Sequence, residues 1–311
     1  MFPIVRSCLI TAALAGSCLG PVIPTAAHAQ GSLKISSHPA LKSNAVLVLD
    51  QSSGEILYGK NAQSIVPIAS ISKLMTAMVV LDAQLDPDEV ITVTEEDVDS
   101  LRGSSSRLRV GAALTRDQLL RLALMASENR AAAALSRAYP GGRPAFVAAM
   151  NEKARTLGLN GTHFLDPTGL SSGNVSTAED LATMVANAHT YPKIREYTTL
   201  TGLDMRVGKR TIAFHNTNRL VANPSWNIGL SKTGFINEAG RCLVMQAELA
   251  GRAVIIVLLD SWGKYTRLTN ASRVRQWIEA AAGIKPAPQR TLTHKVRVRH
   301  RLAATARARR I

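Results

Sequence analysis

The chain has 311 residues, of which 46% are hydrophobic, and its formal net charge is +15. Nine of these charges lie in residues 285–311 and one lies in residues 1–29, which leaves +5 for residues 30–284. This central segment is long enough to bury a sizeable core, and no repeat or linker divides it. Its ordinary charge gives no reason to expect a nucleic-acid-binding domain.

The first 29 residues predict a signal peptide. Arg6 precedes a short apolar stretch at residues 8–19, and an Ala-His-Ala run ends at residue 29, where a signal peptidase reads small residues. We expect cleavage before Gln30. The apolar stretch is too short and too interrupted by proline to span a bilayer. The sequence therefore predicts export to the periplasm.

The remaining elements predict an α+β fold. Residues 45–49 and 55–58 flank a Gln-Ser-Ser-Gly turn and predict an opening β-hairpin. Apolar spacing predicts helices at residues 69–81, 129–139 and 144–158. Two further helices are predicted from their caps: one begins after a Thr115-x-x-Gln118 capping box, and the other after a Ser176-x-x-Glu179 cap. Strands follow at 226–231, 242–249 and 253–259, before a helix at 271–282. Strands at both ends predict one antiparallel sheet flanked by helices, with a helical insertion subdomain.

No metal, cofactor or disulfide is expected. Once the signal peptide is removed, Cys242 is the one cysteine left, and its apolar neighbours predict a core position and not a nucleophile. His163, His189 and His215 lack metal-ligand spacing with one another.

Three short motifs carry the chemistry: Ser-Ile-Ser-Lys at residues 70–73, Ser-Glu-Asn at 127–129 and Lys-Thr-Gly at 232–234. Lys73 lies one helical turn from Ser70 on the same face, where a neutral lysine can take the proton of the hydroxyl. Burial and a second cation both lower a lysine pKa. We expect Lys232 to be the cation that supplies this shift. A helix N-terminus at Ser70 would also place free N–H groups near a developing oxyanion.

Each motif taken alone is weak, and their order and setting favour catalysis. Ser261 and Lys264 repeat the Ser-x-x-Lys spacing, but Gly263 and the strand before it predict a loop. Residues 169–173 match the Gly-x-Ser-x-Gly pattern of α/β-hydrolases, yet turn residues surround them where that motif needs a strand and a helix. Ser127, by contrast, joins two predicted helices and can project from a tight turn.

The three motifs together match the signature of penicillin-binding proteins and class A β-lactamases, with Glu128 where the second element of that signature has Asp. Longer blocks, at residues 67–78, 127–132, 139–142 and 230–235, resemble the D-alanyl-D-alanine carboxypeptidase family of low-molecular-weight penicillin-binding proteins. The resemblance runs from about residue 33 to residue 282 and is strongest to the family's D-alanyl-D-alanine endopeptidase branch. That branch lacks the second β-rich domain and the C-terminal membrane helix that are common among the carboxypeptidases, and we expect the same here.

The resemblance implies a serine β-lactamase/DD-transpeptidase-like fold and a serine DD-peptidase that acts on peptidoglycan stem peptides. By this likeness, Ser70 attacks the D-alanyl carbonyl and becomes acylated, with Lys73 as the proton acceptor. Ser127 relays a proton toward the leaving amine. β-Lactam antibiotics are expected to acylate Ser70 because they resemble the D-alanyl substrate.

The resemblance also implies the substrate contacts. Asn129 would bind the amide of the substrate, and Lys232 and Thr233, followed by Gly234, would hold the carboxylate next to the scissile bond. The backbone N–H groups of the nucleophile and of Phe235 would form the oxyanion hole.

Several alternatives remain open from the sequence. An endopeptidase cleaves cross-links and a carboxypeptidase removes terminal D-alanine; the motifs do not separate them, and the branch resemblance favours the endopeptidase. A β-lactamase needs a glutamate in a loop after Ser-x-Asn, whereas Glu152 is predicted inside a helix and Glu179 in a cap. A non-catalytic wall-binding protein would typically have lost Ser70 or a lysine partner.

Residues 285–311 predict a basic disordered tail, because they are rich in arginine, contain no acid and begin with Lys-Pro-Ala-Pro. Such a tail suits the anionic surface of the wall or a membrane, which would make the protein peripherally associated. The alternative is a passive extension. Nucleic acid is not an expected partner, because exported proteins rarely meet it.

Overall fold

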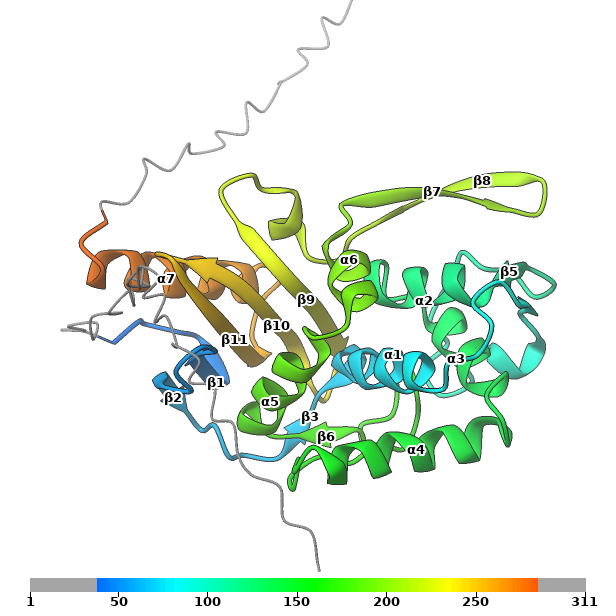
Figure 1. Ribbon diagram of the computed structural model, residues 1–311, viewed down its shortest axis with the longest axis horizontal. Coiled ribbons are helices and arrows are strands. Elements are labelled where there is room, and N and C mark those ends of the chain that lie inside the picture. Colours follow the sequence, from blue (N-terminus) through cyan, green and yellow to red (C-terminus); the bar gives the residue numbers. More distant parts are fainter. Residues whose placement is uncertain (1–37, 285–311) are drawn as a thin grey trace, which may run out of the picture. The chain divides into compact units, whose positions relative to one another are not determined.

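A five-stranded sheet lies on one side of the fold in the computed structural model, which describes residues 38–284, and the helical segments between residues 73 and 156 lie beside it (Figure 1). The predicted signal peptide and basic tail lie outside these residues. All neighbouring strands are antiparallel, in the order β2-β1-β11-β10-β9. The strands are β1 (Ser43–Asp50), β2 (Ile56–Lys60), β9 (Asn227–Ile236), β10 (Gly240–Leu249) and β11 (Arg252–Ser261).

The expected union of the first and last segments in one sheet is confirmed. Strand β1 pairs with β11 over its whole length, so that residues far apart in sequence lie side by side. The insertion between β2 and β9 supplies most of the helices: η1 (Ala69–Ser72), α1 (Lys73–Asp82), α2 (Arg116–Met125), α3 (Asn129–Arg137), α4 (Gly142–Thr156), α5 (Ala178–Ala188) and α6 (Pro192–Thr199). Helix α7 (Thr266–Ala281) follows the last strand.

Successive side chains along each strand point to opposite faces of the sheet, and both faces are buried. Leu47, Val244 and Val257 belong to the large core that includes the inner residues of α1 and α5. Their strand neighbours point the other way and are also buried, and α7 packs on the same strands, β10 and β11. Both faces of the sheet are therefore covered, and α1 is buried nearly all round, as its apolar sequence predicts.

Local capping was predicted correctly at one helix and wrongly at another. The side chains of Thr115 and Gln118 form both bonds of a capping box at the start of α2. At α5 the cap is Thr177, whose hydroxyl accepts from the N–H of Asp180 at 3.0 Å, and not Ser176. Ser176 instead belongs to strand β6 (Val175–Ser176), which pairs with β3 (Val66–Pro67).

Several short elements were not expected from the sequence. Strands β4 (Val90–Thr92) and β5 (Ala113–Thr115) pair with each other, and β7 (Gly202–Val207) and β8 (Arg210–His215) form a hairpin that projects beyond α2 and α6 (Figure 1). Short 3-10 turns lie at η2 (Glu95–Asp97) and η3 (Arg219–Ala222). No helix within residues 38–284 combines the length and apolarity needed to cross a bilayer.

Candidate active site

Ser70 and Lys73 lie together where η1 leads into α1. The Lys73 Nζ donates to the Ser70 Oγ at 2.9 Å. The predicted helix begins with a 3-10 turn, so Ser70 belongs to η1 and Lys73 is the first residue of α1. Ala69, just before Ser70, has φ +48°, a left-handed conformation that is uncommon for alanine and is typical of functional turns.

The ammonium of Lys73 is fully buried among oxygen acceptors. Besides Ser70, its Nζ donates to the Asn129 Oδ1 at 2.8 Å and to the carbonyl oxygen of Thr168 at 2.6 Å. Burial lowers the pKa of Lys73 to about 8, although the carboxylates of Asp166 and Glu128 act in the opposite direction. A useful fraction of Lys73 is therefore neutral near pH 7, as a base for the hydroxyl requires.

A second buried lysine faces the serine of the next motif. The Lys232 Nζ donates to the Ser127 Oγ at 2.8 Å and to the carbonyl oxygen of Thr233 at 2.9 Å. Ser127 has φ +57°, which confirms the tight turn expected between α2 and α3. Burial lowers the pKa of Lys232 well below its usual value, and repulsion by Lys73 and Arg267 lowers it further. For Lys73 itself the leading cause is burial and not Lys232, which corrects the sequence interpretation.

Two glycines allow other segments to approach Ser70 closely. A Cβ added at Gly234 would lie 2.8 Å from the carbonyl oxygen of Ile68 and 3.2 Å from the Ser70 nitrogen. A Cβ at Gly169, where φ is +79°, would overlap the carbonyl oxygen of Ala69. Strand β9 and the 165–174 loop thus contact η1 through bare backbone, which no larger residue permits.

The other residues of the Lys-Thr-Gly segment lie along β9. The Thr233 Oγ1 donates to the Thr217 Oγ1 at 2.7 Å. Phe235 follows Gly234 with its ring half exposed and stacked against the Arg241 guanidinium, 4.5 Å from its centroid. Behind the strand, Arg267 donates to the Gly234 carbonyl at 2.9 Å. Arg267 therefore holds the end of β9 from one side, and the other side of the strand borders Ser70.

Asn129 is held by the loop between η2 and β5. Its Oδ1 accepts from Lys73, and its Nδ2 donates to the Ser104 Oγ at 3.0 Å. The backbone N–H of Ser104 in turn donates to the Asp99 carboxylate at 2.8 Å. These bonds fix the orientation of the amide, which sequence reasoning had not linked to Ser104.

The 165–174 loop supports the site without supplying a nucleophile. The Asp166 carboxylate accepts from the backbone N–H groups of Thr168 at 2.6 Å, Gly169 at 2.8 Å and Ser171 at 2.8 Å. The Ser171 hydroxyl accepts from the N–H of Gly173, so the Gly-x-Ser-x-Gly run is a turn-rich loop, as predicted. The loop presents the Thr168 carbonyl to Lys73, a role that the sequence analysis missed.

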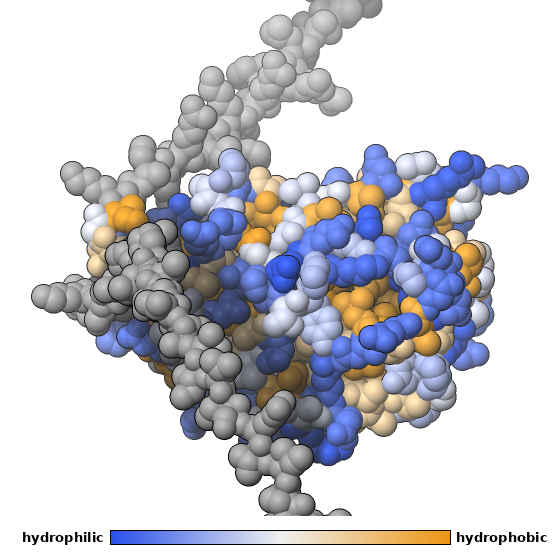
Figure 2. Space-filling view, in the orientation of Figure 1, coloured by the Kyte–Doolittle hydropathy of each residue, from blue (hydrophilic) through white to orange (hydrophobic). Residues whose placement is uncertain are grey.

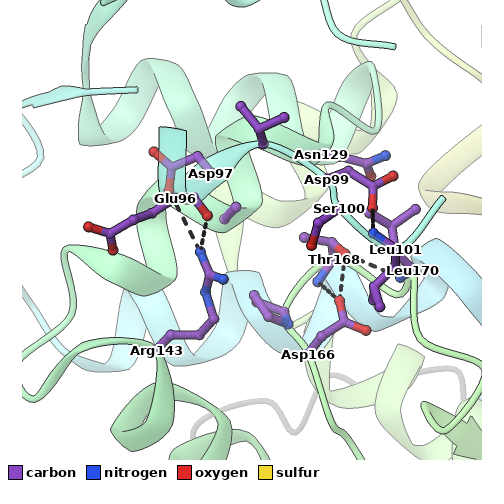
Figure 3. A pocket seen from close by; sticks show the side chains of 13 residues that line it. Glu96, Asp97, Asp99, Ser100, Leu101, Asn129, Arg143, Asp166, Thr168 and Leu170 are labelled. Atoms are coloured by element: carbon purple, nitrogen blue, oxygen red, sulfur yellow. Dashed lines mark hydrogen bonds and ion pairs between the residues drawn. The ribbon is translucent and has the colours of Figure 1, made fainter. Parts of the chain in front are cut away.

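A small cavity adjoins the site. Asn129 and Thr168 line a hollow of about 100 Å³, and Arg143 reaches across it toward Asp97 and the Glu96 carbonyl (Figure 3). Its remaining walls are mainly apolar and include Val98, Leu101, Ala133, Pro167 and Leu170.

The other candidate groups lie in structural positions. Ser261 is buried and shares a 2.7 Å hydrogen bond with Ser43, while Lys264 is exposed beyond the strand. Cys242 is fully buried, and burial raises the pKa of its thiol to about 11, which confirms a core position. Within residues 38–284, no group of three or more His, Cys, Asp or Glu side chains is arranged to hold a metal ion.

Comparison with known proteins finds one family model and several relatives that resemble this chain. Residues 32–263 match the model of the D-alanyl-D-alanine carboxypeptidase family. A D-alanyl-D-alanine endopeptidase of Pseudomonas aeruginosa is 49% identical over 241 residues, which are 77% of this chain and 78% of that protein. The D-alanyl-D-alanine endopeptidase of Escherichia coli is 43% identical over 287 residues, or 91% and 92% of the two chains.

Solved structures show the same fold. The Streptomyces K15 DD-transpeptidase superposes with a TM-score of 0.73 at 30% identity, covering 78% of this chain and 99% of that one. Penicillin-binding protein D2 from Listeria monocytogenes, solved in a cefotaxime-bound form, superposes with a TM-score of 0.69 at 30% identity, covering 78% and 98%.

Proposed function

Because the chain belongs to the D-alanyl-D-alanine carboxypeptidase family of serine peptidases, we propose that it cleaves D-alanyl peptide bonds in peptidoglycan through an acyl-enzyme on Ser70. The observation that carries this proposal is the 2.9 Å hydrogen bond between Ser70 and a fully buried Lys73 whose pKa is about 8. A serine hydroxyl becomes a strong nucleophile when such a base takes its proton.

The proton movements follow from the two lysine–serine pairs. Neutral Lys73 takes the proton as the Ser70 Oγ bonds to the D-alanyl carbonyl carbon. When the tetrahedral intermediate collapses, the C–N bond breaks and the leaving amine needs a proton. Ser127 is suited to relay it, because its hydroxyl is bonded to the Lys232 ammonium. Water then adds to the ester carbonyl and gives a proton through Ser127 to the now neutral Lys232, and the bond from the Ser70 Oγ to the acyl group breaks as Ser70 takes its proton back from Lys73.

The substrate contacts occupy the other side of Ser70. Backbone N–H groups of Ser70 and Phe235 would bind the oxyanion, a placement supported by the close approach of Gly234 to Ser70. Lys232 and Thr233 would bind the carboxylate next to the scissile bond, because an ammonium and a hydroxyl both donate hydrogen bonds to a carboxylate. Asn129 would bind the substrate amide through its Nδ2.

Within this reaction class, cleavage of cross-links is the preferred activity. The similarity to two D-alanyl-D-alanine endopeptidases, at 49% and 43% identity, supports it. The alternative is removal of terminal D-alanine, which is supported by more distant carboxypeptidase relatives such as one from Bacillus subtilis at 30% identity.

Digestion of purified cross-linked and uncross-linked muropeptides tests the assignment. We expect dimers to be converted to monomers by the native protein, and Ser70→Ala to abolish both this activity and labelling by fluorescent penicillin. Ser171→Ala is the matched control, because it removes the serine of the rival motif and should retain labelling. Release of D-alanine from monomers without dimer cleavage would make the protein a carboxypeptidase.

The proposed function extends to inhibition by β-lactams and to the location of the protein. β-Lactams should acylate Ser70 and form a slowly hydrolysed adduct, a proposal supported by the relative from Listeria solved with cefotaxime. We also propose that the protein acts in the periplasm after removal of residues 1–29, with residues 285–311 drawn to an anionic wall or membrane surface.

A further inference from the structure

A second, larger hollow lies away from Ser70, between the tip of the β7–β8 hairpin and the loop that precedes β5. Its volume is about 560 Å³. One wall is formed by residues 106–112 and the other by residues 207–212. We call this hollow the basic groove, because four cations line it: Arg107, Arg109, Lys209 and Arg210.

The charge of the basic groove is not balanced from within the fold. None of the described residues that line it carries a carboxylate. Over the part of the chain that the structure describes, Arg109, Lys209 and Arg210 form no ion pair. The hairpin's one carboxylate, Asp204, lies outside the lining. At the hairpin tip, on the upper right of Figure 2, the surface is strongly hydrophilic. Like charges gathered in a hollow attract an anionic partner.

Both walls of the basic groove are connected to the leaving-group side of the active site. Ser106 lines the groove, and its hydroxyl bonds to the carboxylate of Glu128, the residue that follows Ser127. On the other wall, β8 ends two residues before Thr217, the hydrogen-bond partner of Thr233. Each wall of the groove is therefore linked, through Glu128 or through Thr217, to one of the two residues assigned to the leaving amine and to its neighbouring carboxylate.

The walls are also tied to each other. The Arg107 guanidinium donates to the Ala213 carbonyl at 2.7 Å and lies 4.3 Å from the centroid of the Phe214 ring. Arg107 thus has a structural role, whereas the exposed side chains of Arg109, Lys209 and Arg210 are left to meet a ligand.

Resting on the proposed function, we propose that the basic groove binds the acceptor stem peptide of a cross-linked substrate through its free carboxylates. In a carboxypeptidase reaction the leaving group is a single D-alanine, which ends at the carboxylate assigned to Lys232 and Thr233. In cross-link cleavage the leaving group is a whole stem peptide, which has further acidic groups and extends by about 3.3–3.6 Å per residue. Contacts in the groove would therefore favour cross-linked over uncross-linked substrates.

The test compares two charge-matched double variants on a purified cross-linked muropeptide dimer and on its monomer. Lys209→Gln/Arg210→Gln removes two groove cations. Lys42→Gln/Arg155→Gln removes one lysine and one arginine elsewhere. We expect the groove variant to lower kcat/KM for the dimer about threefold to tenfold, since each exposed ionic contact contributes modestly. Rates on the monomer and of acylation by penicillin should match those of the native protein in both variants.

Two further measurements identify the ligand. Amidation of the acceptor carboxylates, leaving free the one next to the scissile bond that is assigned to Lys232 and Thr233, should remove the advantage of the native protein over the groove variant in dimer cleavage. Added salt should make that advantage smaller. Equal dimer cleavage by the native protein and the groove variant would overturn the inference while leaving the proposed function intact. Failure of the native protein to cleave the dimer at all would instead overturn the endopeptidase assignment. A groove variant that loses only affinity for phosphatidylglycerol vesicles would assign the groove to a lipid surface.

Discussion

The pKa of Lys73 should move when a charge is placed beside it, and Asn129 offers an isosteric way to do so. The Asn129 Oδ1 lies 2.8 Å from the Lys73 Nζ, so Asn129→Asp puts a carboxylate at that distance. A carboxylate so close stabilises the ammonium and should raise the pKa of Lys73 by about one to three pH units.

The expected loss of activity follows from the neutral fraction. With a pKa of about 8, roughly one Lys73 in ten is neutral at pH 7, against about three in ten thousand for an ordinary lysine. Asn129→Asp should therefore reduce acylation at pH 7 by about ten- to a thousandfold. It should also move the midpoint of the rise in rate with pH from about 8 to about 9–11.

The assay is the rate of acylation by fluorescent penicillin measured from pH 6 to pH 11. Asn129→Ala is the control, because it also loses the amide that we assign to substrate binding but adds no charge. Its midpoint should stay near that of the native protein or fall, since a hydrogen bond to the ammonium is lost. If Asn129→Asp has the same midpoint as the native protein, Lys73 is not the titrating base and the proposed mechanism is wrong.

Three further predictions concern the scaffold. Gly169→Ala should slow penicillin acylation at least about tenfold in stopped-flow assays, because its Cβ would overlap the Ala69 carbonyl, whereas unchanged rates would show that the loop can retreat. Asp50→Asn should lower the free energy of unfolding by about 2 kcal/mol in urea titrations, because it leaves the buried Arg252 with the exposed Glu55 as its remaining counter-ion; a loss below about 1 kcal/mol would contradict this. Cys242, buried and with a pKa of about 11, should react with a thiol reagent only after unfolding, so labelling of the native protein would contradict its core position.

The parts of the fold that could be predicted are those encoded locally. The opening hairpin, the capping box at Thr115 and the apolar α1 each have a sequence signal that spans a few residues. The β7–β8 hairpin was missed because its strands are mixed in polarity and half exposed, so little periodicity marks them. At the start of α5, the adjacent residues Ser176 and Thr177 both have a hydroxyl that could cap the helix. Thr177 is the cap because Ser176 belongs to β6, which pairs with β3.

The same distinction applies to the candidate site. The side chains of Ser70, Lys73 and Lys232 were found because their residue types recur in a fixed order. The Thr168 carbonyl could not be found in this way, since every residue has a carbonyl and only the loop geometry directs this one to Lys73. The glycine at 169 offered a signal, but it was assigned to a turn and not to a close approach to the nucleophile.

The two buried lysines give a physical reason for the substrate carboxylate that we propose to bind at Lys232 and Thr233. Burial of Lys232 disfavours its charged form, and the neighbouring Lys73 and Arg267 disfavour it further. A carboxylate bound at Lys232 and Thr233 would reverse this balance, because it pairs with the ammonium and offsets the cost of burial. The same event would favour the charged Lys232 that bonds to Ser127, and would thus prepare a proton for the leaving amine. Substrate recognition and proton delivery would then depend on one charge, which a substrate without the carboxylate could not supply.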